Sequence, residues 1–156
     1  MPLRNSSSSS STLAAHGRIL LVDDNVSGSL ARKTVLEELG HKIHMASSGA
    51  DALEQFSQHK YDLVVTDFRM PRMDGLELIG RLRKQQADIL IILVSGFVDT
   101  LGLNEATTGA DAVIQKSANE VTHLVRAVNR LLRRKPAKKV AATAESRALK
   151  AKRHAG

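Results

Sequence analysis

The chain has 156 residues, of which 42% are hydrophobic and only 3% aromatic, so the sequence predicts one ordinary domain with an aliphatic core. It contains no cysteine, which excludes disulfide bonds and cysteine-ligated metal, and no apolar run approaches the roughly 20 residues that span a bilayer. Of the net charge of +7, residues 130–156 carry +9, with ten Lys and Arg and one acid, so the remainder is slightly acidic at −2.

Three segments follow from composition along the chain. Residues 1–17 form a Ser-rich leader without the apolar stretch of a signal peptide, and we expect it to be disordered. Residues 135–156 form a basic tail rich in Ala and Lys, which Pro136 separates from the preceding helix. A single domain is expected over residues 18–134, in a protein that we expect to be cytoplasmic and without membrane contact.

Strand-like and helix-like segments alternate through this domain. The expected strands are 18–22, 42–46, 61–66, 89–94 and 111–115. The expected helices are 27–39, 49–58, 73–85, 98–109 and 118–134, of which 98–109 is a poor helix interrupted by Gly102. Segment 89–94, "ILIILV", is the most apolar run in the chain and is expected to be a central strand buried on both faces.

This alternation predicts an α/β fold: a doubly wound five-stranded parallel sheet with helices on both faces, of the flavodoxin-like type. Ligand sites in such folds lie beyond the carboxyl ends of the strands, where the strand order reverses. Chemically active side chains follow four of the five expected strands, and we therefore expect them to meet at one edge. They are Asp23, Asp24, Asp67, Ser95 and Lys116.

Three carboxylates at one edge repel one another, by about 4 kcal/mol for each pair at about 4 Å and an effective dielectric near 20. A divalent cation relieves this repulsion, and oxygen ligands without cysteine favour Mg²⁺. A metal beside a free carboxylate suggests phosphoryl transfer. In that chemistry Asp67 attacks, while Lys116 and the Ser95 hydroxyl hold phosphoryl oxygens.

Five motifs in order resemble the receiver domain of two-component response regulators, of the chemotaxis-regulator type. They are "VDDN" after the first strand, "DFRMPRMDG" after the third, "SG" after the fourth, "GAD" before the fifth and Lys116 after it. The resemblance covers residues 17 to about 134. It implies that the domain is a signalling module that catalyses only its own phosphotransfer and dephosphorylation, and that its donor is a phosphohistidine on a sensor histidine kinase or phosphotransfer protein.

The resemblance also implies a role for each site residue. Asp67 is the expected phosphoacceptor. Asp24 is expected to bind Mg²⁺ directly, together with Asp67 and the backbone carbonyl of Arg69, while Asp23 acts mainly through water. Ser95 is the expected switch hydroxyl, and Lys116 the lysine that pairs with the phosphoryl group.

The chain departs from the pattern at four positions. Val113 stands where an aromatic residue usually couples phosphorylation to the output face, so a weaker switch is expected. Ser117 replaces a cis proline, and a cis bond without proline costs roughly 3 kcal/mol, so the loop that holds Lys116 is expected to run differently. Arg69 and Phe97 are bulky at the positions that face the attacking water, where they are expected to alter the phosphoryl lifetime.

Plainer interpretations stay open for each feature. The paired acids at 23 and 24 could cap a helix, Asp67 could begin a turn, and the six histidines, including His41 and His44, are taken as solvated or structural. Three functions remain: a phosphorylated receiver, a receiver-regulated binder of nucleic acid or another polyanion through the basic tail, and an interaction scaffold that is not phosphorylated. The sequence leaves the cognate kinase, the output target and the oligomeric state open.

Overall fold

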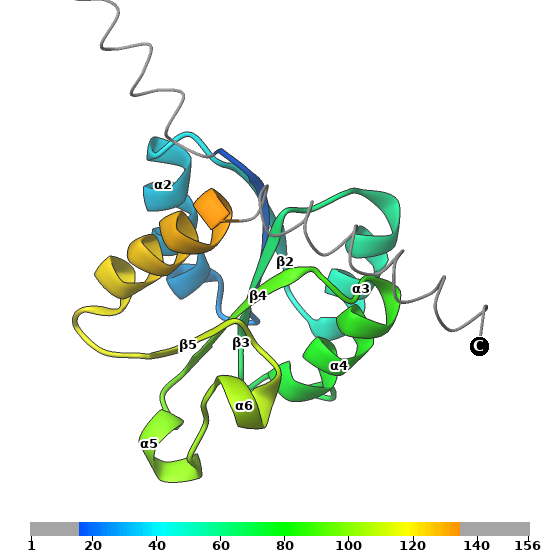
Figure 1. Cartoon of the computed structure of the whole chain (residues 1–156), viewed down its shortest axis with the longest axis vertical. Coiled ribbons are helices and arrows are strands. Elements are labelled where there is room, and N and C mark those ends of the chain that lie inside the picture. Colours follow the sequence, from blue (N-terminus) through cyan, green and yellow to red (C-terminus); the bar gives the residue numbers. More distant parts are fainter. Residues whose placement is uncertain (1–15, 135–156) are drawn as a thin grey trace, which may run out of the picture.

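A computed structural model describes residues 16–134, which form a single sheet covered by helices on both faces (Figure 1). The five strands are all parallel and follow the order β2-β1-β3-β4-β5. Their bounds are β1 (Arg18–Val22), β2 (Lys42–Ala46), β3 (Leu63–Asp67), β4 (Leu90–Ser95) and β5 (Ala112–Gln115). The predicted doubly wound, flavodoxin-like fold is thus confirmed.

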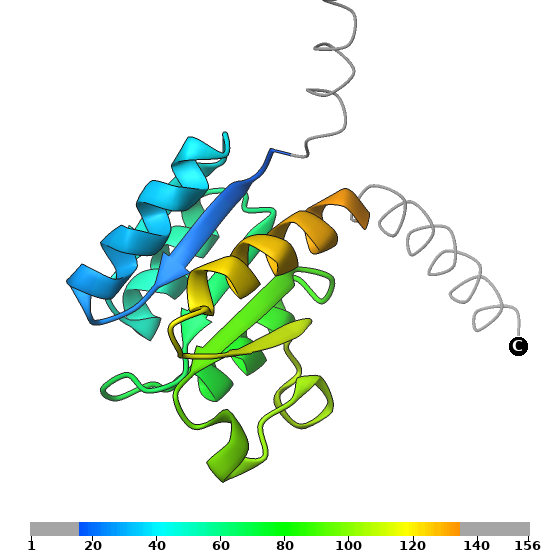
Figure 2. The same ribbon diagram turned by 90° about the vertical axis from the view of Figure 1, so that its left-hand side faces the viewer.

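Two apolar clusters, one on each face of the sheet, hold the helices in place. One contains Leu36 of α2 (Val26–Glu38) together with Leu124 and Val128 of a helix that runs from residue 120 to residue 134. The other contains side chains of α3 (Gly49–Gln58) and α4 (Gly75–Gln85). Figure 2 shows α2 and the helix of residues 120–134 lying together over one face. This packing brings the start of that last helix close to the loop that follows β1.

Residues 89–94 were expected to be a central strand buried on both faces, and β4 confirms this expectation. Every residue of β4 is buried, as its apolar sequence predicts, and β4 lies between β3 and β5. β3 begins two residues later than expected and ends at Asp67 itself. The acid therefore belongs to the strand, where its backbone is fixed by pairing with Val94.

The poor helix expected over 98–109 is two short helices instead, α5 (Val98–Leu101) and α6 (Glu105–Thr108). Gly102 closes α5 in the left-handed conformation, with φ of 63°, which glycine adopts without steric cost. Asn104 then begins α6 with a reciprocal cap in which its side chain and that of Thr107 each accept a backbone N–H. The glycine and this cap together explain why one helix does not continue through the segment.

Several expectations fall outside the described residues. The basic tail of residues 135–156 and residues 1–15 of the leader lie there, and the division of the chain into leader, domain and tail stays a prediction. Among residues 16–134, no helix has the length and apolarity that crossing a membrane requires.

Candidate functional site

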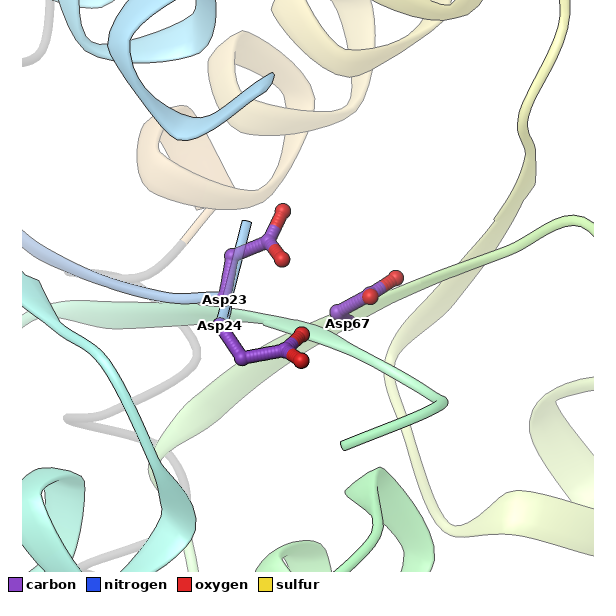
Figure 3. Close-up of side chains that lie close together, drawn as sticks. All are labelled: Asp23, Asp24 and Asp67. Atoms are coloured by element: carbon purple, nitrogen blue, oxygen red, sulfur yellow. The ribbon is translucent and has the colours of Figure 1, made fainter. Parts of the chain in front are cut away.

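Three aspartates meet where the strand order reverses, between β1 and β3 (Figure 3). Asp23 and Asp24 follow β1, and Asp67 is the last residue of β3. One carboxylate oxygen from each lies within 4.8 Å of the others. Asp23 and Asp67 are buried and Asp24 is exposed, so the group is closed on the protein side and open to solvent at Asp24.

The "DG" turn that follows β3 is shaped by close backbone contact with Asp67. The Gly75 N–H donates to the Phe68 carbonyl at 2.7 Å, and a Cβ at Gly75 would lie 2.6 Å from the Asp67 carbonyl oxygen. Asp74 caps α4 by accepting the N–H of Glu77. Only glycine at position 75 lets α4 begin directly against the end of β3, so this part of the motif positions the acid.

Lys116 reaches the acid from the end of β5. Its Nζ lies 2.7 Å from an Asp67 carboxylate oxygen, and its backbone N–H donates to the Ser95 carbonyl at 2.9 Å. No peptide bond among the described residues is cis, so the step from Lys116 to Ser117 is trans. The lysine thus contacts Asp67 although the bond that follows it is trans and is not formed by the usual cis proline.

Ser95 is the last residue of β4, the strand that pairs with β3, and it is 1% exposed. Its hydroxyl accepts the backbone N–H of Phe97 at 2.9 Å, which turns it toward its own loop. The Phe97 ring in turn lies under the guanidinium of Arg69, 4.4 Å from the ring centroid. The two bulky side chains noted in the sequence therefore stack on each other, an arrangement that is favourable as a cation–π contact.

A fifth charged residue at this edge, Arg32 of α2, was not predicted from the sequence. It is 5% exposed, and one of its guanidinium nitrogens lies 2.8 Å from an Asp23 oxygen. Its Nε donates to Glu120, at the start of the helix of residues 120–134. A signal was present, because Arg32 lies three residues after the buried Ser29 and four before the buried Leu36, on the inner side of α2.

These contacts set the charge states at the site. Burial raises the pKa of Asp67, and the charge of Asp23 adds to this, while the hydrogen bond from Lys116 acts in the opposite direction. Burial alone would lower the pKa of Arg32, but its bonds to Glu120 and Asp23 outweigh burial and the pKa is raised. Arg32 is therefore a permanent cation beside the aspartates.

The expected mutual repulsion of three acids is thus partly relieved by the protein itself. Asp67 is paired with Lys116 and Asp23 with Arg32, whereas the Asp24 carboxylate makes no hydrogen bond or ion pair within residues 16–134. Oxygen ligands that converge within 4.8 Å, one of them open to solvent, still fit a hard divalent cation. The residues present are therefore compatible with Mg²⁺.

The model of the response regulator receiver domain family matches residues 19–129. The chain belongs to this family. Among curated relatives, it is 32% identical over 117 residues to the gliding motility regulatory protein of Myxococcus xanthus, covering 73% of this chain and 15% of that protein. It is 34% identical over 119 residues to the alkaline phosphatase synthesis transcriptional regulatory protein PhoP of Bacillus subtilis, covering 72% of this chain and 48% of that protein. The chain thus spans less than half the length of either relative.

Solved receivers share the whole fold. The response regulator TrrA of Thermotoga maritima, crystallised in complex with Mg²⁺-BeF, is 36% identical, with a TM-score of 0.66 over 73% of this chain and 97% of its own. A CheY-like receiver domain protein from Methanospirillum hungatei is 26% identical, with a TM-score of 0.70 over 78% of this chain and 97% of its own. A receiver is a signalling domain, and receivers bind Mg²⁺ at an acidic pocket such as this one.

Val113, which stands at the usual aromatic position of a receiver, is half-buried against the cluster that holds α3 and α4. Its backbone N–H donates to the Glu105 carboxylate of α6 at 3.2 Å. The backbone of β5 is thus joined to α6 through the Glu105 side chain.

Proposed function

We propose that this receiver accepts a phosphoryl group on Asp67 from the phosphohistidine of a sensor histidine kinase or phosphotransfer protein, and that its altered surface then carries the signal. The observation that carries the proposal is the position of Asp67. It is a buried carboxylate at the strand-order reversal, 2.7 Å from Lys116 and grouped with two further acids. Neither a helix cap nor a simple turn accounts for that grouping.

The reaction is a transfer between two nucleophiles. An Asp67 oxygen attacks phosphorus, the phosphorus–nitrogen bond to the donor histidine breaks, and the imidazole leaves with the electron pair and gains a proton. Lys116 is close enough to neutralise a phosphoryl oxygen once the group is in place, and the Ser95 hydroxyl can donate to another after it turns from Phe97. The domain thereby catalyses its own phosphotransfer. It also catalyses its dephosphorylation, in which water attacks the phosphorus, the bond to the Asp67 oxygen breaks and the carboxylate leaves.

Mg²⁺ would be held by Asp24, Asp67 and the backbone carbonyl of Arg69. When bound, it would neutralise charge that develops on the transferred group. Asp24 is the exposed member of the acidic group, so it offers a ligand that the protein has not already paired. Support from a relative is the Mg²⁺-BeF complex in which TrrA was crystallised.

Phosphoryl uptake tests the proposal directly. The protein is incubated with phosphoramidate and Mg²⁺, and the intact mass is measured. We expect one added phosphoryl group, none with Asp67→Asn, and normal uptake with the control Asp88→Asn, which changes an exposed aspartate away from the site. Equal labelling of Asp67→Asn and the parent would place the acceptor elsewhere, and no labelling of the parent would favour the scaffold.

A second function, binding to nucleic-acid phosphates, is favoured by a row of arginines on the helix of residues 120–134. This row contains four arginines, all of them exposed, and none forms an ion pair with an acid of the described region. They are Arg126, Arg130, Arg133 and Arg134. Their spacing puts them along the outer side of the helix, next to the basic tail of residues 135–156 in the sequence.

Salt-dependent binding to a labelled DNA duplex tests this second function. Contact with six phosphates gives a log–log slope of about −5 in affinity against salt. Removal of residues 136–156 should weaken binding, and so should replacement of the arginines at 126, 130 and 133 by glutamine. As a control, replacement of Lys60, Arg81 and Lys84 by glutamine removes the same charge elsewhere on the surface and should leave binding unchanged. Equal binding by all variants, or none near physiological salt, would leave the arginines as a solvated face.

A further inference from the structure

Arg32 is a buried cation that joins the acidic group to a distant helix. The Arg32, Asp23 and Glu120 side chains are 6%, 2% and 16% exposed, so both ion pairs are shielded from water. Exposed ion pairs contribute little because solvent screens them, but a shielded guanidinium between two carboxylates is held in one geometry. The sequence separation is large, because Arg32 lies on α2 and Glu120 begins the helix of residues 120–134.

Each oxygen of the Asp23 carboxylate accepts a hydrogen bond in this arrangement. One of its oxygens accepts the Asn25 N–H at 2.8 Å, and the other accepts from Arg32 at 2.8 Å. Both donors come from α2 or the turn that begins it. A cation that approached the acidic group would therefore find Asp23 already hydrogen-bonded on both oxygens, while the Asp24 carboxylate faces solvent.

We propose that Arg32 is a positioning residue of the phosphoacceptor site. Arg32 holds Asp23 away from direct metal contact, and its positive charge weakens Mg²⁺ binding. It also transmits changes at Asp23 to the helix of residues 120–134 through Glu120. The inference rests on the proposed function, in which Mg²⁺ is bound at this edge. It assigns a role to a residue that contacts neither the metal nor the phosphoryl group.

The charge of Arg32 has a measurable effect on affinity. Even at the dielectric of bulk water, a unit charge about 6 Å from a divalent ion changes its affinity roughly tenfold. Removing the arginine together with its second partner, in Arg32→Met with Glu120→Gln, leaves no buried charge unpaired apart from Asp23, which becomes available to the metal. The loss of the Glu120 charge, which lies farther from the metal, offsets part of this gain, so we expect Mg²⁺ to bind several-fold more tightly to this double variant.

The second effect is on the helix. A cation that draws Asp23 toward itself loosens the Asp23–Arg32 bond, and the guanidinium then shifts toward Glu120, in the first turn of the helix. Addition of Mg²⁺ should therefore change amide hydrogen exchange at residues 120–124 of the parent. In Glu120→Ala, where Arg32 still neutralises Asp23, the change at these residues should disappear.

Both effects are measured on the full chain. Mg²⁺ affinity is obtained by following backbone amide resonances during titration, and hydrogen exchange is measured with and without Mg²⁺. Arg32→Lys keeps the charge and should bind Mg²⁺ like the parent. As a matched control, Arg81→Met with Glu77→Gln removes an exposed ion pair of the same kind and should change neither quantity.

Specific results would overturn the inference. Affinity in the Arg32→Met, Glu120→Gln variant that equals or falls below that of the parent rejects the charge effect, and so does an absence of Mg²⁺ binding in both proteins. Unaltered exchange at 120–124 in the parent, or the same change in Glu120→Ala, rejects the transmission. Phosphoryl uptake by the parent is scored separately, so a failure here leaves the proposed acceptor standing when Asp67 is still labelled.

Discussion

Asp23 and Asp24 are neighbours in sequence, yet replacement by alanine should strongly destabilise the fold at Asp23 and leave its stability almost unchanged at Asp24. Asp23→Ala leaves the guanidinium of Arg32 buried with one carboxylate instead of two. Breaking a buried ion pair from one side costs about 3–5 kcal/mol, and because Glu120 remains as a partner we expect a value near the lower end, about 3 kcal/mol. Asp24→Ala removes an exposed side chain and should change stability by less than about 0.5 kcal/mol.

These free energies translate into melting temperatures. The entropy of unfolding is about 2.1 cal/mol/K for each residue, so the 119 described residues give about 0.25 kcal/mol/K. A loss of about 3 kcal/mol then lowers Tm by roughly 12 °C in Asp23→Ala, whereas Asp24→Ala should remain within about 2 °C of the parent.

Thermal and urea denaturation without divalent cations measures the stability of the two variants and of the parent, and so tests whether the Arg32 ion pair stabilises the fold. Adding Arg32→Met to Asp23→Ala should recover part of the loss, because the two substitutions remove the same interaction and are not additive. If Asp23→Ala melts at the same temperature as Asp24→Ala, the Arg32 ion pair does not stabilise the fold and the reasoning is refuted.

Three further outcomes follow from the site and its surroundings. Burial raises the folded-state pKa of Asp67, so its ionised form lowers stability above that pKa and has no effect below the unfolded value. Asp67→Asn should therefore raise Tm at pH 7, and the gain should vanish in acid; a pH-independent Tm difference would contradict this. Gly75→Ala should lower stability by about 2 kcal/mol and reduce phosphoryl uptake, since its Cβ meets the Asp67 carbonyl, while Gly80→Ala, which meets nothing, should be neutral or slightly stabilising. Residues 98–109 should exchange amide hydrogens faster than β4 (Leu90–Ser95), because they form two four-residue helices with few buried side chains; equal protection would count against that.

The sheet and the positions of its acids were predictable because their signals are local. Short apolar runs separated by helical periodicity determine a parallel sheet, and the rule for ligand sites places Asp67 and Lys116 at one edge. The structure puts these two side chains in contact. The split of 98–109 was less visible, since it depends on the left-handed Gly102 and on the reciprocal Asn104 cap rather than on apolar spacing.

Arg32 was not predicted, for a physical reason. A sequence pattern counts an arginine on a helix as solvent-facing unless its partners are known, and these partners come from the loop after β1 and from a helix that begins 88 residues later. The position of Arg32 between the buried Ser29 and Leu36 was the available clue. The repulsion expected from the acids alone was therefore too large, because Arg32 neutralises Asp23.

The pairing of charges also explains how such an edge can fold before it meets a metal. Three unpaired carboxylates would oppose folding by several kcal/mol, since each pair costs about 4 kcal/mol at short range. Lys116 offsets the charge of Asp67, and Arg32 offsets that of Asp23, which leaves a single uncompensated carboxylate. That carboxylate belongs to Asp24, which is exposed, so water screens the remaining repulsion. The Asp24 carboxylate is also the ligand that a cation from solvent reaches first.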